Sequence, residues 1–484
     1  MRWIVPKRIA DRPAGTMRDM DRRTFLRGMA GVAGLAALGG CASLPPPSVA
    51  PGSAGETVIV VGAGASGLAA ALRLVAAGYT VTVLEGRDRI GGRAWTSDSL
   101  GAPVDLGASW IHGTSDNPLT PLARAAGLRF AATSFDAYTT YDQDGRPLPP
   151  QQDGELYDLW LRRSAAAGRL RGGPNGRRSF AEAFALASVD SGLAASSDLD
   201  PALVQRYMTW IQAVDVTVDL AADPGHLDAA ALLDGGSMDG PWVMLDRGYR
   251  ALLEPVAAPL DLRLGVPITA VNSSATRVTV SSATDTYAAD RAIVTVSLGV
   301  LKHGDVAFDP PLPQATSDAI GRLGMGDFLK VGLRFGERVW PNGADWLGRL
   351  GETSFPEWVD LTAATGKPIA IGFAGGDEAR RLETLPEADV VGLGLDALGA
   401  AIGRVLPTPE AVVVTHWAAD PFARGSYSSL AVGASGTDRD ALAAPIGDRV
   451  FLAGEATNRR HPSTVHGAWE SGLAAADRVI AARG

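Results

Sequence analysis

Apolar stretches near residue 60 predict the first folded unit of the chain. Residues 57–61 are apolar and β-branched almost without interruption, which is typical of a parallel strand buried on both faces. A glycine-rich turn follows, then apolar residues at helical spacing over 68–77, and then a strand-like run over 79–84 that ends at Glu85. We therefore predict a strand, a turn, a helix and a second strand, the arrangement of nucleotide-binding α/β folds.

Later stretches show both the helical and the strand periodicity, so the predicted fold class is α/β. The predicted elements are amphipathic helices around 156–170 and 202–214, strands over 329–335 and 411–417, and a closing strand over 449–453 with a helix over 467–482. The closing strand and helix are expected to share one domain with the strand near residue 60.

The first 41 residues have the pattern of an export signal. Arg22-Arg23 precedes Phe25-Leu26 and an apolar run that is shorter than the roughly 20 residues needed to span a bilayer. The arginine pair resembles the twin-arginine signal of proteins exported in the folded state. A basic N-terminus beside a buried helix is the alternative. We expect an exported, periplasmic protein.

Cys41 ends a Leu38-Gly-Gly-Cys41 stretch that resembles a bacterial lipobox, in which the cysteine is acylated. Residues 42–54, rich in Pro, Ser and Gly, would then form a linker between the lipid anchor and the folded protein. A free cysteine within a cleaved leader is the alternative.

Charge and cysteine content narrow the classes of function. After residue 41 the chain has 36 basic and 50 acidic residues, a poor balance for binding nucleic acid, which needs basic clusters. The single cysteine excludes internal disulfides and cysteine-rich metal sites. The six histidines show no HxH or HExxH spacing, so we expect no metal.

The glycine-rich turn predicts a dinucleotide site. Gly62 permits a tight turn, Gly64 lets the pyrophosphate approach the backbone, and Gly67 allows close packing of the helix. Ala65 and Ser66 stand between them at the helix N-terminus, which favours phosphate. Glu85 can accept hydrogen bonds from the ribose hydroxyls. A glycine turn without a ligand is the alternative, and this pattern alone does not separate NAD from FAD.

Further motifs, in order along the chain, resemble the flavin amine oxidase family. The motifs are Val83–Arg93 with its second glycine pair, Asp105–Gly113, Val294–Lys302 with Phe308–Pro313, Leu323–Lys330, and Trp417–Tyr427 followed by Gly454–Thr457 and Ser463–Ala468. The polyamine oxidase, spermine oxidase and lysine-specific histone demethylase branch is the most similar, with monoamine oxidases also related. The resemblance covers about residues 57–480.

The resemblance implies a discontinuous, Rossmann-like FAD-binding domain (55–115, 242–306 and 447–484) and an α+β substrate-binding domain (116–241 and 307–446). It implies non-covalent FAD, because Ser426 stands where monoamine oxidases have the flavin-bound cysteine. Beyond the turn residues, the implied cofactor-binding residues are Glu85, Gly86, Arg87, Gly92, Arg93, Gly107, Ala108, Ser109, Trp110, Ile268, Trp417, Gly454, Glu455, Thr464 and Val465.

Lys330 is the leading catalytic candidate. The chain has 40 arginines and four lysines, and in the family the matching lysine holds a water against flavin N5 and assists reoxidation. Trp417 would pack on the flavin, and Tyr427 would form one wall of an aromatic cage whose other wall is replaced by Thr464. His112 stands where polyamine oxidases carry a group near the amine. The alternatives are a solvated strand face for Lys330 and a structural role for His112.

The reaction implied is oxidation of an amine, preferably polyamine-like, by hydride transfer to flavin N5, which gives an imine and then an aldehyde. Either O2, which becomes H2O2, or a periplasmic carrier would accept the electrons. A monoamine oxidase, an L-amino acid oxidase, an amine dehydrogenase and a non-catalytic FAD-bearing scaffold are the rival interpretations. The oligomeric state is left open.

Overall fold

The computed structural model describes residues 55–482, apart from 135–136, 171–176, 196–197 and 353. The predicted export signal, Cys41 and the linker therefore lie outside the described residues. Within the described part, no helix combines the length and the apolar character needed to cross a bilayer.

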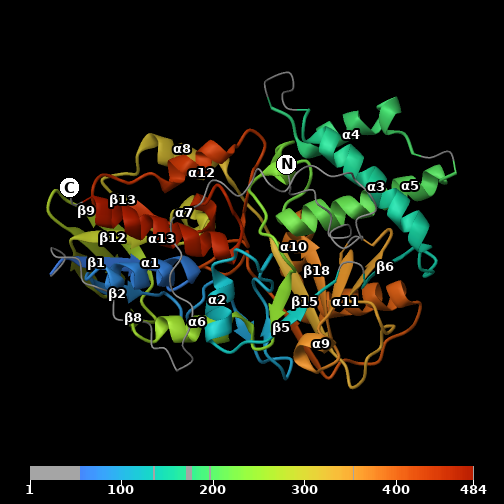
Figure 1. Ribbon diagram of the computed structural model, residues 1–484, viewed down its shortest axis with the longest axis horizontal. Coiled ribbons are helices and arrows are strands. Elements are labelled where there is room, and N and C mark those ends of the chain that lie inside the picture. Colours follow the sequence, from blue (N-terminus) through green and yellow to red (C-terminus); the bar gives the residue numbers. More distant parts are fainter. Residues whose placement is uncertain (1–54, 135–136, 171–176, 196–197, 353, 483–484) are drawn as a thin grey trace, which may run out of the picture.

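A five-stranded parallel sheet forms the nucleotide-binding side of the molecule, at the left of Figure 1. Its order is β21 (Val450–Leu452), β12 (Arg291–Val294), β1 (Thr57–Val61), β2 (Thr80–Leu84) and β8 (Asp261–Arg263). Three segments that are far apart in the sequence thus build one sheet. The predicted strands near residues 60, 80 and 450 are confirmed.

Helices α1 (Ala65–Ala76) and α13 (Val465–Ala481) lie side by side against this sheet (Figure 1). They approach closely because small residues face each other at the contact. The hydroxyl oxygens of Ser66 and Ser471 are 3.2 Å apart, and a Cβ on Gly472 would come within 2.0 Å of the Ser66 carbonyl oxygen. This packing fixes the N-termini of both helices relative to the sheet.

A smaller four-stranded sheet extends the same side. Its order is β11 (Thr286–Ala289), β10 (Val278–Ser282), β9 (Ile268–Ser273) and β13 (Ala307–Asp309). Strand β13 pairs with β9, so the nucleotide-binding side continues slightly beyond the boundary expected at residue 306. Nearby helices are α6 (Gly248–Ala257), α7 (Leu298–His303), α8 (Gln314–Arg322) and α12 (Gly436–Ala443).

A six-stranded mixed sheet forms the core of the other side, drawn mostly in orange in Figure 1. Its order is β19 (Ala411–Val414), β15 (Phe328–Arg334), β18 (Ile369–Gly375), β17 (Glu357–Asp360), β16 (Trp346–Arg349) and β6 (Tyr138–Tyr141). The predicted strand over 329–335 is confirmed as β15. The strand expected to reach Trp417 ends at Val414, so Trp417 lies in the following turn.

Helices cover this sheet and extend beyond it at the upper right of Figure 1. They are α3 (Pro150–Ala167), α4 (Phe180–Ser188), α5 (Pro201–Gln212), α9 (Thr362–Thr365), α10 (Gly376–Glu383) and α11 (Glu387–Ile402). The two helices predicted in this region are confirmed as α3 and α5, with shifted ends. Helix α5 continues as a π-helix over Ala213–Val218, a rare geometry that is frequent at functional sites.

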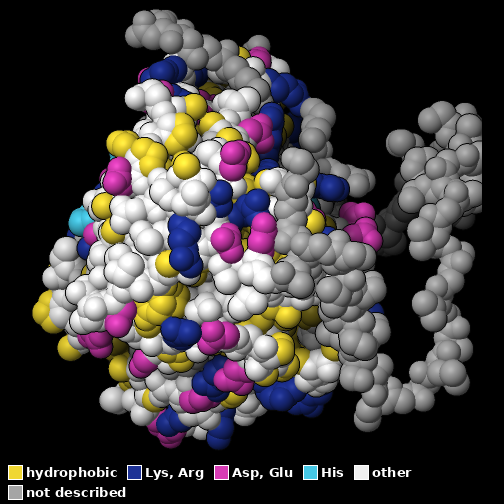
Figure 2. All heavy atoms as spheres, turned by 90° about the vertical axis from the view of Figure 1, so that its left-hand side faces the viewer, with side chains coloured by type: hydrophobic (Ala, Val, Ile, Leu, Met, Phe, Trp, Pro, Cys, Tyr) yellow, Lys and Arg dark blue, Asp and Glu magenta, His cyan; other side chains and the backbone are white. Residues whose placement is uncertain are grey.

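Short elements connect the two sides. They are β3 (Thr96–Ser97), β4 (Val104–Asp105), α2 (Leu119–Ala125), β5 (Phe130–Ala132), β7 (Val243–Leu245), β14 (Gly324–Met325) and β20 (Ser428–Ser429). Figure 2 shows acidic and basic side chains interspersed over the face formed by the nucleotide-binding side.

Candidate active site

One large cavity, of about 1350 Å³, runs between the two sides of the molecule. It brings together almost all the residues that the sequence predicted. Those lining it are Gly62, Gly64, Ala65, Ser66, Glu85, Gly86, Arg87, Gly92, Arg93, Gly107, Ala108, Ser109, Trp110, His112, Ile268, Lys330, Trp417, Tyr427, Gly454, Glu455, Thr464 and Val465. Gly67, predicted with them, does not line the cavity.

The three glycines of the turn have different structural surroundings. Gly62 has a φ of +102°, which L side chains rarely adopt. A Cβ on Gly67 would lie 1.9 Å from the carbonyl oxygen of Gly62, so Gly67 serves the packing of α1. Gly64 has ordinary backbone angles, and the nearest atom to a Cβ there would be 3.9 Å away. The protein itself does not require Gly64 to be small, which fits a bound pyrophosphate.

Glu85 holds the glycine turn in place. One carboxylate oxygen accepts a hydrogen bond from the Ala63 backbone N–H at 2.7 Å, and the other from the Arg87 N–H at 2.9 Å. Each oxygen keeps a further lone pair for a ribose hydroxyl. Arg87, which lines the cavity, is itself paired with Asp420 at 2.6 Å.

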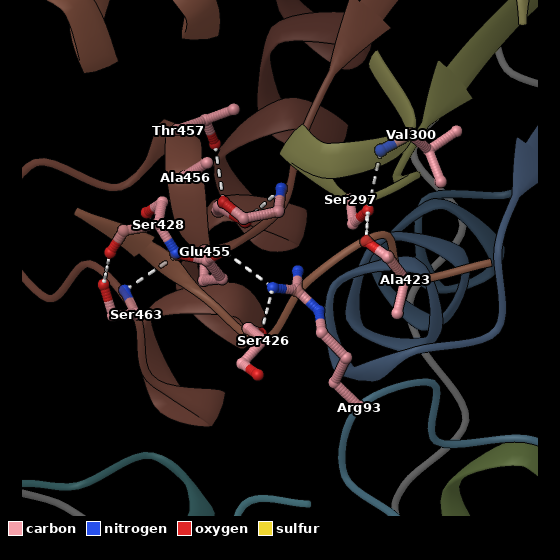
Figure 3. A network of polar contacts seen from close by, with 12 residues as sticks. Arg93, Ser297, Val300, Ala423, Ser426, Ser428, Glu455, Ala456, Thr457 and Ser463 are labelled. Carbon is pink, nitrogen blue, oxygen red and sulfur yellow. Dashed lines mark hydrogen bonds and ion pairs between the residues drawn. The ribbon is translucent and has the colours of Figure 1, made fainter. Parts of the chain in front are cut away.

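Glu455 is the centre of a buried polar network (Figure 3). Its oxygens accept hydrogen bonds from Arg93 at 2.9 Å, from the Ser428 hydroxyl at 2.6 Å and from the Ser463 N–H at 3.0 Å. Burial would raise the pKa of Glu455, but the charges of Arg93 and Arg439 and the Ser428 bond outweigh burial and lower it. The carboxylate is therefore ionised and fixed.

Arg439 supports this network from behind, and the sequence did not single it out. Its side chain is completely buried, donates to Ser428 Oγ at 2.7 Å and pairs with Asp234 at 2.7 Å. The family resemblance implied that Arg93 binds the cofactor. In the structure its guanidinium bonds Glu455 and the Ser426 carbonyl, so Arg93 also joins two loops of the cavity wall.

Trp417, Ser426 and Tyr427 belong to one loop that follows β19. Trp417 is buried and lies edge-on to Trp95, with ring centroids 6.0 Å apart. The Tyr427 hydroxyl donates to the Val218 carbonyl of the π-helix at 2.8 Å, which fixes its ring. Ser426 Oγ accepts from the Phe328 N–H at 2.9 Å, so the position that carries a flavin-bound cysteine in monoamine oxidases is here a structural serine.

Thr464 and Val465 place the N-terminus of α13 at the cavity. Thr464 Oγ1 accepts from the Gly467 N–H at 3.0 Å and donates to the His461 carbonyl, so its hydroxyl caps the helix. The positive end of the helix dipole thus lies at the cavity. Burial, together with His112 and His461, lowers the pKa of His466 to about 3, so His466 is neutral.

His112 lies on the cavity wall against Trp242, with the two rings perpendicular and their centroids 4.2 Å apart. Its ring is therefore oriented by an aromatic neighbour in the position expected for contact with a substrate. Its backbone carbonyl accepts from the Asn117 amide. Both the predicted role near the amine and the structural alternative agree with this placement.

Lys330 is buried in the middle of β15, with 3% of its surface exposed. The alternative of a solvated strand face is therefore wrong. Its Nζ donates to the Gly107 carbonyl and to Ser109 Oγ, both at 2.6 Å, and to the Asp105 carbonyl at 3.0 Å. Burial lowers the pKa of Lys330 to about 7, although the negative charge of Asp105 opposes this shift. A side chain with these properties can hold or release a proton at neutral pH.

The sequence interpretation missed an aromatic wall and a carboxylate beyond Lys330. The rings of Trp110 and Trp346 are stacked with centroids 5.5 Å apart, and Phe328 lies 6.0 Å from Tyr427. Glu357 on β17 lines the same part of the cavity and is 1% exposed. An acidic residue inside the apolar stretch 355–359 was the only signal, and it does not show which face of the strand points inward.

Comparison with known proteins agrees with this geometry. Residues 65–480 match the sequence profile described as "Flavin containing amine oxidoreductase". The chain belongs to this family. It is 35% identical over 438 residues to "Probable polyamine oxidase 4" of Arabidopsis thaliana, with 87% of this chain and 86% of the relative covered.

Two further amine oxidoreductases widen the comparison. "Lysine-specific histone demethylase 1 homolog 3" of Oryza sativa subsp. japonica is 36% identical over 448 residues, which cover 88% of this chain and 54% of that protein. The solved structure of a putrescine oxidase bound to putrescine superposes with a TM-score of 0.71 at 21% identity, over 88% of this chain and 99% of the other. The family membership makes this protein a flavin-dependent oxidoreductase of amines, with FAD as its cofactor.

The residues of the cavity fit the cofactor of an amine oxidoreductase. Gly64 leaves room at the N-terminus of α1 for the pyrophosphate, Glu85 offers acceptors to the ribose, and the N-terminus of α13 offers a positive field to the flavin ring. Lys330 and Trp417 line the cavity between these groups and the aromatic wall. The arrangement thus places the redox group between the nucleotide-binding sheet and the substrate side.

Proposed function

We propose that this amine oxidoreductase acts on polyamine-like substrates, that is, aliphatic amines that carry a second positive charge. The observation that carries the proposal is the buried carboxylate of Glu357 in the wall of the cavity, close to Tyr427. Burial raises the pKa of Tyr427, and the charges of Asp219 and Glu357 add to this shift, so both acids act on the tyrosine electrostatically. A cation is stabilised where negative charge is held in a dehydrated pocket.

Different residues of the cavity would bind different parts of such a substrate. The rings of Tyr427 and Phe328 offer apolar contact to the carbon chain and a π-face to an ammonium group. Glu357, which also accepts a hydrogen bond from the Tyr138 hydroxyl at 3.4 Å, would bind the distal ammonium group. Holding the distal end fixes which carbon of the chain faces the flavin.

Bound flavin would supply the redox chemistry as an acceptor for the hydride of the carbon next to the amine nitrogen. The substrate nitrogen must be neutral at this point, and His112, which lines the cavity, would bind it. The imine product hydrolyses to an aldehyde in water. We propose O2, reduced to H2O2, as the final electron acceptor, with a periplasmic carrier as the alternative.

An amino acid substrate is less well supported by the cavity. Recognition of its carboxylate would call for an arginine near the aromatic wall. The arginines lining the described cavity are Arg87, Arg93 and Arg424, and each is paired with a carboxylate. They lie toward the nucleotide end, where they contribute to the cavity wall.

The test is a panel of amines scored by anaerobic bleaching of the flavin. Putrescine, spermidine and spermine should reduce the flavin faster than benzylamine or phenethylamine. Glu357→Gln keeps the shape of the side chain and removes its charge, so it should weaken the binding of diamines about 10-fold or more while monoamines are little affected. Glu410→Gln, which neutralises an acid that pairs with Arg334 outside the cavity, is the matched control.

Three outcomes would contradict the proposal. If arylalkylamines reduce the flavin faster than every polyamine, the substrate belongs to the monoamine class. If Glu357→Gln and Glu410→Gln affect diamines equally, Glu357 does not bind the distal ammonium group. Flavin that no amine bleaches would indicate a non-catalytic scaffold.

We also propose that the protein is exported in its folded state and functions in the periplasm. The basis is the arginine pair at positions 22 and 23, followed by a short apolar run. Acylation of Cys41 would attach the protein to a membrane through the Pro/Ser/Gly-rich residues 42–54. The lipid anchor rests on a shorter motif than the export signal, namely the stretch that ends at Cys41.

A further inference from the structure

Lys330 uses all the hydrogen bonds that an ammonium group can donate. Two of its three acceptors are backbone carbonyls, those of Asp105 and Gly107, which can only accept. The third is the hydroxyl of Ser109, which can accept or donate. Of the three partners, Ser109 alone can reverse its role when Lys330 changes its charge.

The Ser109 hydroxyl has a second partner, which makes the reversal possible. Its own proton points to the Asp105 carbonyl, at 3.0 Å from Oγ, while Oγ accepts from Lys330 at 2.6 Å. If Lys330 loses a proton, Nζ gains a lone pair, and the Ser109 proton can rotate from the carbonyl to Nζ. Both the charged and the neutral form of the lysine then keep three hydrogen bonds. This matters because a buried donor or acceptor without a partner costs free energy.

A second, small cavity adjoins the same group. Its volume is about 20 Å³, and Ser109, Lys330 and Asp105 are among its lining residues. Ser109 and Lys330 also line the large cavity, so they separate the two. A volume of this size accommodates one water molecule beside the polar groups. Lys330 therefore lies between the large cavity, which would hold the flavin, and the small cavity, where a water molecule could return a proton to Nζ.

We propose that Ser109 is a positioning residue that lets Lys330 take up and release a proton in place, by reversing the direction of their shared hydrogen bond. The inference rests on the assignment of Lys330 to the flavin, and it concerns the return of reduced flavin to the oxidised state. In that half-reaction O2 takes up two electrons and two protons to give H2O2. One proton comes from the reduced flavin and the other from the Lys330 ammonium group.

The charged environment of Lys330 sets the direction of the expected effect. Among the described residues, the ionisable side chain that acts on Lys330 is Asp105, and β18 contributes the ring of Phe373, whose centroid lies 5.8 Å from Nζ. Removing the Ser109 hydroxyl takes one acceptor from the ammonium form. Because a bond to a charged donor is about twice as strong as one to a neutral group, the charged form loses more and the pKa of Lys330 falls.

The experiment measures how fast reduced flavin is reoxidised by O2 as the pH is changed. The flavin is reduced with dithionite, so no amine takes part and failure of the polyamine proposal cannot affect the result. The wild-type rate should fall as pH rises through the pKa of Lys330. In Ser109→Ala this fall in rate should occur about one pH unit lower than in the wild type. In Ser109→Thr, which keeps the hydroxyl, the fall should occur at the wild-type pH.

Thr316→Val, which removes a buried hydroxyl from α8 outside both cavities, is the matched control and should keep the wild-type profile. If Ser109→Ala does not fold with flavin bound, Ser109→Cys replaces it, because a thiol is a weak hydrogen-bond partner and should shift the profile in the same direction. A wild-type rate without pH dependence would overturn the proposal. So would equal profiles for the wild type and the hydroxyl-free variants.

Discussion

Lys330 shows how strongly its surroundings change the chemistry of one side chain. On a solvated strand it would remain an ammonium group at any physiological pH. Burial on β15 lowers its pKa, while three oxygens from the segment 105–109 hold it in one position. A lysine in this state joins the two sides of the molecule and can exchange a proton.

Replacement of Lys330 by methionine should slow the reoxidation of the flavin by O2 about 100-fold or more, because a general acid is lost. The variant should still fold and bind FAD, since methionine fills a similar volume. Stopped-flow mixing of the reduced protein with O2 measures this rate. Lys302→Met is the control, since Lys302 bonds the carbonyls at the end of α8 and does not line the cavity. Equal rates in both variants would return Lys330 to a structural role.

Single residues were predicted from the sequence where their chemistry was conspicuous. Lys330 was found because lysine is rare in this chain and stands inside a recognised motif. Glu357 was missed because its position depends on the pairing of β17 with β18, and Arg439 because its position depends on the packing of α12. Neither contact can be predicted from the neighbouring residues in the sequence. Ser109 was assigned to the cofactor, but its bond to Lys330 joins positions 221 residues apart.

At the scale of elements, local sequence patterns were sufficient to predict the glycine turn but not the course of the loop after β19. The turn was predicted because one uninterrupted apolar strand and one helix define it on either side. Trp417 was expected within a strand, yet β19 ends at Val414 and the chain turns so that Trp417 and Tyr427 both face the cavity. The turn is thus a local property, whereas the loop is shaped by the elements that it contacts.

The glycine turn offers a prediction that separates binding from folding. Gly64→Ala should weaken FAD binding about 10- to 100-fold, because its methyl group would occupy space meant for the pyrophosphate. It should leave the thermal stability of the FAD-free protein nearly unchanged, since no protein atom lies within 3.4 Å of the new Cβ.

Gly67→Ala should behave in the opposite way. Its Cβ would lie 1.9 Å from the Gly62 carbonyl oxygen, so the turn or α1 must move and the melting temperature of the FAD-free protein should drop by several degrees. Flavin fluorescence titration and thermal unfolding of both variants measure the two effects. Equal FAD affinity in Gly64→Ala and the wild type would mean that the pyrophosphate does not approach this residue.

At the scale of the whole molecule, the cavity lies between a nucleotide-binding side and a substrate side, each with its own sheet. Alternation of helices and strands was enough to predict an α/β fold, and family resemblance suggested its discontinuity. The π-helix over Ala213–Val218 could not be predicted, because its register is stabilised by contacts such as the Tyr427 hydroxyl bond to Val218.

The proposed export would act on the whole folded protein, and it can be tested at this scale. Changing Arg22-Arg23 to Lys-Lys should leave the protein in the cytoplasm with its flavin bound, because the folded part of the chain is unchanged. Fractionation and flavin fluorescence measure location and cofactor content together. Normal export of this variant would contradict the twin-arginine interpretation.

Lipid attachment needs a separate measurement. Labelling with a radioactive fatty acid should mark the wild type and be lost in Cys41→Ala, since the chain has no other cysteine. Absence of label in the wild type would remove the anchor from the proposal and leave the proposed export to be judged by the Arg22-Arg23 variant.

The parallel sheet has a consequence for biosynthesis. Strand β1 and the glycine turn leave the ribosome early, but β21, Glu455 and α13, which complete the sheet and the cavity, are made several hundred residues later. A chain interrupted before residue 450 therefore lacks one edge strand and the groups that would surround the flavin ring. We therefore expect flavin to bind only after translation has passed α13, so bound flavin would indicate that the chain was made at least to the end of this helix.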